Sequence, residues 1–108
     1  MDQRVEHVIF FIRKNYHRKL TLAEMAATVN LSRFRLSHIF KVDTGTSPER
    51  FLAKVRLERA KHLLETEFLT VKEVMTQVGM ADASYFTRRF KAAYGVTPAK
   101  CRTSVKKR

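Results

Sequence analysis

Two short segments of this chain concentrate side chains that bind anions and hydrogen-bond to planar polar groups. Residues 33–41 contain two arginines, a lysine and a histidine, and residues 83–91 contain two arginines and a lysine. Neither segment contains an acidic residue. A solvated helix face without an anionic partner usually interleaves both signs of charge. The one-sided composition therefore indicates that both segments meet an anion, and a guanidinium group can bind phosphate or a purine edge bidentately.

The composition of the whole chain points the same way. Its 108 residues carry 22 Lys and Arg against 10 Asp and Glu, a net charge of +12, which favours a nucleic acid or an anionic membrane surface as partner. No nucleophile–base pair, carboxylate pair or glycine-rich phosphate loop is present, so we expect no enzyme. Four scattered histidines and one cysteine lack ligand spacing, so we expect no metal and no cofactor. Without a signal peptide or a long apolar run, we expect no membrane insertion and a cytoplasmic location.

The two basic segments belong to a unit that the sequence repeats about fifty residues apart. Residues 20–25 (LTLAEM) return as 69–74 (LTVKEV), and each copy has Thr followed three residues later by Glu, the pattern of a capping box. Asn30 and Gly79, which tolerate positive φ, end these short helices in the two copies. In both copies a second capped helix then begins.

The periodicity predicts an all-α chain of seven helices without strands. A first helix covers residues 3–16, and a long helix from Pro48 to about Leu64 contains no breaker. We expect a first subdomain over 1–47, a central linker helix over 48–65, and a second subdomain with a frayed basic tail over 66–108.

A short helix, a tight turn and a second helix make a helix-turn-helix motif. Two copies with basic second helices predict a sequence-specific, double-stranded DNA-binding module. Its recognition helices would cover residues 33–42 and 83–93.

The duplicated unit resembles the DNA-binding domain of AraC/XylS-type transcription regulators over about residues 5–103. The residues that carry this resemblance are 22–26, Ser32, Leu36, 40–41, 45–48, 56–64, 79–82, 84–86, Arg88, 90–91 and 95–98. The chain departs from the family pattern at Met75, Met80 and Cys101, where a small residue, an aromatic and a tyrosine are usual.

The resemblance implies two helix-turn-helix subdomains joined by the long central helix, with the recognition helices in successive major grooves on one face of DNA. It also implies contact with RNA polymerase, as in many members. Such regulators usually carry a separate effector or dimerisation domain, for which 108 residues leave no room. The chain is either a minimal stand-alone regulator or a piece of a longer parent chain, and we expect the longer parent chain. The DNA would hold the protein at the nucleoid.

The resemblance also assigns roles to individual residues, which physical chemistry then sorts. Arg88 suits guanine O6 and N7, while Phe34 and Ala83 suit a thymine methyl group. The side chains of Ser37, Ala83 and Ser84 are short, which leaves few bidentate base contacts. Part of the specificity should therefore come from DNA shape. The expected base contacts are Arg33, Phe34, Ser37, His38, Ala83, Ser84, Tyr85 and Arg88. The expected phosphate contacts are Arg35, Lys41, Arg89 and Lys91.

Other interpretations remain open at this stage. The charge alone also fits a general basic RNA- or ribosome-associated protein. A membrane-surface or protein-interaction domain could use the first helix, although Phe10 and Phe11 are expected to pack in or beside the core. Cys101 could be a redox switch, but a small buried side chain in place of the family's tyrosine is the simpler interpretation.

Overall fold

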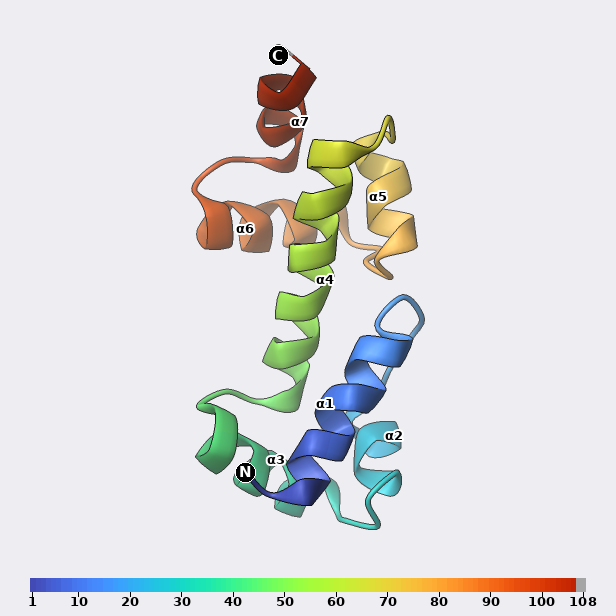
Figure 1. The fold of residues 1–108 in the computed structure, drawn as a ribbon, viewed down its shortest axis with the longest axis vertical. Helices are drawn as coiled ribbons and strands as arrows, with labels where there is room; N and C mark the ends of the chain where they lie inside the picture. The colour runs from blue at the N-terminus through green and yellow to red at the C-terminus, as the bar shows by residue number, and fades with distance from the viewer. Residues whose placement is uncertain (107–108) are drawn as a thin grey trace. The chain divides into compact units, whose positions relative to one another are not determined.

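The computed structural model describes the backbone of residues 1–106 and the side chains of residues 1–102, and within this range the chain forms seven helices and no strand (Figure 1). This confirms the expected all-α class. Of the basic tail predicted to fray, Lys107 and Arg108 lie outside the described residues. The helices are α1 (Gln3–Asn15), α2 (Leu22–Ala27), α3 (Arg33–Thr44), α4 (Pro48–Thr66), α5 (Val71–Gln77), α6 (Ala83–Tyr94) and α7 (Pro98–Lys106).

The helices form two compact units, Met1–Val55 and the chain from Arg56 onward. In the first unit α1, α2 and α3 pack on one another, and in the second α5, α6 and α7 do so. The division falls inside α4, which runs unbroken from one unit into the other. The chain is thus a pair of helix-turn-helix units joined by a long helix. The finer division into 1–47, 48–65 and 66–108 stays a prediction.

The core of the first unit forms around one stripe of α1. Val5, Val8 and Ile12 recur at helical spacing and are completely buried. The ring of Phe40 from α3 meets that of Phe51 edge-on, with 5.6 Å between centroids. The other buried members of this core are Met25, Ala26, Leu36, Leu52 and Val55. Burial of Leu36 and Phe40 fixes which face of α3 points inward.

The second unit buries equivalent positions of its own helix pair. Phe86 and Phe90 on α6 are completely buried, with ring centroids 5.8 Å apart. Tyr94 continues the aromatic row at 4.9 Å from Phe90. Met80 is also buried, as expected for a replacement of the family's aromatic. Because α3 and α6 bury the same two repeat positions, they expose the same face.

Left-handed backbone occurs at the turns where the sequence predicts it. Asn30 has φ 56° and lies in the turn between α2 and α3. Gly79 has φ 80° and lies in the turn between α5 and α6. Gly45 and Gly95 end α3 and α6 with φ 81° and 78°, and each donates its N–H to a carbonyl of the preceding helix. Glycine and asparagine adopt this conformation at the least cost.

The predicted capping box is complete in the second copy. The Thr70 hydroxyl accepts the Glu73 N–H at 3.0 Å, and the Glu73 carboxylate accepts the Thr70 N–H at 2.9 Å. This reciprocal pair lowers the pKa of Glu73, chiefly through the hydrogen bond that the carboxylate accepts from the Thr70 backbone.

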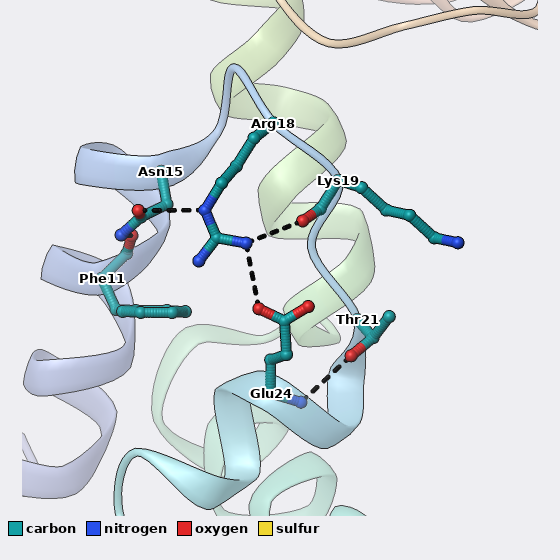
Figure 2. Close-up of polar contacts among 6 residues, drawn as sticks. All are labelled: Phe11, Asn15, Arg18, Lys19, Thr21 and Glu24. Atoms are coloured by element: carbon teal, nitrogen blue, oxygen red, sulfur yellow. Dashed lines mark hydrogen bonds and ion pairs between the residues drawn. The ribbon is translucent and has the colours of Figure 1, made fainter.

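In the first copy the predicted capping box is wrong, because only half of it forms. The Thr21 hydroxyl accepts the Glu24 N–H at 3.1 Å, but the Glu24 carboxylate pairs with Arg18 at 3.0 Å (Figure 2). Arg18 is held by the side chain of Asn15 at 3.2 Å and by the carbonyl of Lys19 at 2.9 Å. A carboxylate binds a charged guanidinium more strongly than a neutral amide, so Glu24 turns toward Arg18.

The two neighbouring phenylalanines of α1 differ in their environment. Phe11 packs against the core as expected, but the expectation for Phe10 is wrong, because its side chain is 60% exposed. The core stripe of α1 already fills its inward face, and Phe10 lies off that stripe. The Lys14 ammonium covers the exposed ring at 5.4 Å from its centroid.

Candidate nucleic-acid interface

Each basic segment is the second helix of its helix-turn-helix motif and begins at a capping side chain. The Ser32 hydroxyl accepts the Arg35 N–H at 3.0 Å, which starts α3 at Arg33. The Asp82 carboxylate accepts the Tyr85 N–H at 2.9 Å, which starts α6 at Ala83. Both helices begin where the sequence predicts and continue one or two residues beyond the predicted ends, to their glycine caps.

The exposed face of α3 collects most of the first set of predicted residues. Arg33, Phe34, His38 and Lys41 are exposed, and Ser37 is half-buried. At about 100° per residue, the side chains of residues 34, 37, 38 and 41 project within an arc of roughly 100°, and Arg33 projects about 40° outside it. Phe34 is 85% exposed, so a large apolar ring lies among cations in solvent. Exposed Arg35 projects outside this arc.

The exposed face of α6 collects the second set. Ala83, Ser84, Arg88 and Lys91 are exposed, and the last three project within an arc of roughly 60°. Tyr85 is 39% exposed and lies toward one side. Ser84, Arg88 and Lys91 therefore share one surface of the helix, whereas Ala83 and Tyr85 project to either side of it.

Arg89 is the exception in this group. It projects about 160° around α6 from Lys91. Its side chain is half-buried, and its Nε is buried without a hydrogen-bond partner among the described residues. Its role as a phosphate contact stays a prediction, and a phosphate would have to approach the flank of α6 to meet it.

The cations of both exposed faces lack local compensation. Within the described part of the chain, no ion pair involves Arg33, Lys41, Arg88 or Lys91. The acidic side chain of α3, Asp43, instead accepts the N–H of Asp2 at 2.7 Å. Unpaired positive charge on two capped helices is suited to a polyanion.

Arg56, which lies on α4 in the second unit, was expected to carry the family resemblance but was assigned no base or phosphate role. Burial lowers the pKa of its guanidinium, while the nearby Tyr85 hydroxyl raises it. An arginine between the buried residues Val55 and Leu57 was the available signal. Arg56 therefore interacts electrostatically with Tyr85, near the start of α6.

Other chemistries find little support in the described residues. Within this part of the chain, no group of three or more His, Cys, Asp or Glu side chains could hold a metal ion. No helix built from these residues is long and apolar enough to span a bilayer. Cys101 is buried, and desolvation raises the pKa of its thiol, which opposes the reactive thiolate that a redox switch needs.

Two capped helix pairs, each exposing the unpaired cations of its second helix, define a duplicated helix-turn-helix protein. Comparisons with known proteins agree with this class. Residues 25–104 match the family described as "Helix-turn-helix domain". The raffinose operon transcriptional regulatory protein RafR of Pediococcus pentosaceus is 34% identical over 97 residues, which are 90% of this chain and 35% of that protein. The Msm operon regulatory protein of Streptococcus mutans is 33% identical over 101 residues, 94% of this chain and 36% of that protein.

Solved structures show the same architecture. The C-terminal domain of AraT, a response regulator from Geobacillus stearothermophilus, superposes with a TM-score of 0.88 at 33% identity, covering 95% of this chain and 86% of that one. The DNA-binding domain of AdpA in complex with a target DNA superposes with a TM-score of 0.88 at 25% identity, covering 94% and 92%.

The chain belongs to the AraC-type helix-turn-helix family, which confirms the resemblance seen in the sequence. It spans about a third of the length of the two curated relatives described above. Those relatives are transcription regulators, a class of protein that is not enzymatic, and nothing in these comparisons supports the RNA-binding alternative.

Proposed function

We propose that this domain binds double-stranded DNA sequence-specifically as part of a transcription regulator, with α3 and α6 entering successive major grooves. The observation that carries the proposal is the pair of exposed helix faces, equivalent in the repeat, whose cations have no acidic partner among the described residues. Segments 1–47 and 66–108 would each supply one recognition helix, and segment 48–65 would link them. The DNA complex of the related AdpA domain supports the same partner.

The side chains on α3 and α6 suit different contacts. Arg88 offers two parallel donors for guanine O6 and N7, and the exposed ring of Phe34 offers an apolar surface for a thymine methyl group. Single hydrogen bonds from Ser37, His38 or Ser84 discriminate less between bases. The remaining base contacts proposed are Arg33, Ala83 and Tyr85. The phosphate contacts proposed are Arg35, Lys41, Arg89 and Lys91, which position the protein without specifying sequence.

The two faces are chemically different, which has a consequence for the binding site. The exposed face of α3 combines cations with the ring of Phe34, whereas that of α6 combines Ser84 and Arg88 with one further cation, Lys91. Each helix should therefore select its own base sequence. We propose an asymmetric site of about two helical turns rather than a palindrome.

Selection of bound duplexes from a random pool tests this proposal. The expected result is one enriched motif with two unlike halves, about one helical turn between their centres. Competition against a structured RNA of equal length serves as the control. One enriched motif together with tighter binding to duplex DNA than to the RNA supports the proposal. Enrichment of no motif, or tighter binding to the RNA, refutes it.

The wider setting of the domain also belongs to this proposal. Its relatives are about three times as long as the matched segment, which supports an effector or dimerisation domain on a longer parent chain. Contact with RNA polymerase is supported by the family resemblance alone. DNA binding would place the protein at the nucleoid in the cytoplasm.

A further inference from the structure

A cavity of about 280 Å³ lies where α3 ends and α4 begins. It is lined by two cations, two hydroxyl side chains and a glycine: Lys41, Arg50, Thr46, Ser47 and Gly45. None of the lining residues is acidic. Lys41 and Arg50 are exposed, and neither forms an ion pair within the described part of the chain.

The chemistry of this lining suits a phosphate group. Lys41 supplies a compact ammonium donor and Arg50 a planar guanidinium. The acidic neighbours along the chain, Asp43 and Glu49, do not line the cavity, and Asp43 is engaged with the Asp2 N–H at 2.7 Å. An anion in the cavity would therefore meet two full positive charges without a competing carboxylate in its lining.

The position of Lys41 connects this cavity with the proposed DNA-binding face. On α3, Lys41 projects in nearly the same direction as Phe34 and Ser37, one to two turns further along the helix. The cavity therefore continues the exposed face of α3 at its C-terminal end. We infer that it holds one backbone phosphate of the duplex whose bases α3 contacts, with Arg50 as a phosphate ligand that neither the sequence nor the family match assigns. This inference rests on the proposed function.

The internal repeat supplies an independent argument. Fifty residues after Lys41 and Arg50, the second copy has Lys91 and Lys100, again cationic. Ser47 Oγ accepts the Arg50 N–H at 3.2 Å, and the hydroxyl of its counterpart Thr97 accepts the Lys100 N–H at 3.2 Å. The two helix junctions thus share both their cations and their local geometry, as expected if each helix-turn-helix unit needs a phosphate ligand there.

Salt-dependent binding to the selected duplex tests the assignment. Neutralising the pair with Lys41→Gln and Arg50→Gln should make the slope of log K against log salt less negative by about 0.9, the value for one phosphate contact. The same contact is worth about eight-fold in affinity at 0.1 M salt, lost equally on every duplex sequence. The matched control, Lys14→Gln with Arg59→Gln, removes the same charge from exposed side chains outside the cavity. This control should leave the slope unchanged.

Single methylphosphonate substitutions in the duplex then locate the phosphate. The wild-type domain should lose affinity at each phosphate it contacts, and the Lys41→Gln/Arg50→Gln variant should fail to respond at one of these positions, beside the α3 half-site. If the variant stays as sensitive as the wild type at every position, or its slope matches that of the control, the phosphate assignment is wrong while DNA binding stands. If the wild-type domain itself prefers no duplex, the proposed function fails as well.

Discussion

Replacing Arg88 by alanine separates base recognition from simple charge attraction. The Arg88 side chain is exposed and forms no hydrogen bond or ion pair with the described residues, so its loss should change the free energy of unfolding by less than about 0.5 kcal/mol. A bidentate arginine–guanine contact is worth about 1–3 kcal/mol. At 1.4 kcal/mol per factor of ten, binding to the preferred site should weaken about five- to 140-fold.

The assay must distinguish this loss from that of a phosphate contact. Duplexes selected by the wild-type domain and by Arg88→Ala should differ at one or two base pairs of one half-site, with the rest of the motif retained. Arg89→Ala is the matched control, because it removes the same charge from the neighbouring position, whose side chain points to the flank of α6. The control should leave base preference unchanged.

The outcome for unrelated duplexes decides the interpretation. If Arg88→Ala weakens binding by the same factor on every sequence and lowers the salt slope by about 0.9, Arg88 contacts phosphate rather than a base. If Arg89→Ala alters the selected motif and Arg88→Ala does not, the assignment of the exposed face of α6 to the groove is wrong.

Three further predictions concern stability and reactivity. Gly45→Ala should destabilise the first unit by about 1–2 kcal/mol in urea unfolding, because φ is +81° while an added Cβ meets no atom within 4 Å; a loss well above this range would indicate a steric clash. The lowered pKa of Glu73 means that its carboxylate stabilises the fold above the ordinary value of 4.5 and that this contribution is lost as the pH falls through the lowered value. Thermal midpoints of Glu73→Gln should therefore vary less with pH below 4.5 than those of the wild type, and identical profiles would contradict the role assigned to the capping box. Cys101 should react with iodoacetamide near pH 7 far more slowly in the native domain than in urea, since its thiol is buried with a raised pKa; equal rates would restore the redox interpretation.

Much of the fold could be predicted because local signals and the repeat agree. Ser32, Asp82 and the glycines at 45 and 95 set the ends of α3 and α6 through contacts within a few residues along the chain. The residues buried from the two recognition helices, Leu36 with Phe40 and Phe86 with Phe90, recur at helical spacing. The same spacing left the complementary stripe exposed, and many of the contacts that the family resemblance assigns lie on that stripe.

The errors arose where a side chain had a choice of partner. Glu24 had both the Thr21 amide and Arg18 within reach, and the position of Arg18 depends on an irregular loop that no periodic pattern describes. Phe10 was misplaced because two adjacent phenylalanines on a helix cannot share one face, and hydrophobicity alone does not select between them. The cavity beside Lys41 was not foreseen, because Arg50 reaches it from the next helix.

The exposed ring of Phe34 has one more chemical implication. An apolar ring against the C5 position of a pyrimidine senses a methyl group, and it cannot tell which base carries that group. Cytosine methylated at C5 presents its methyl at the same place in the major groove as thymine does. If Phe34 contacts thymine, epigenetic marking of a cytosine at that step would create a binding site where the unmodified DNA has none.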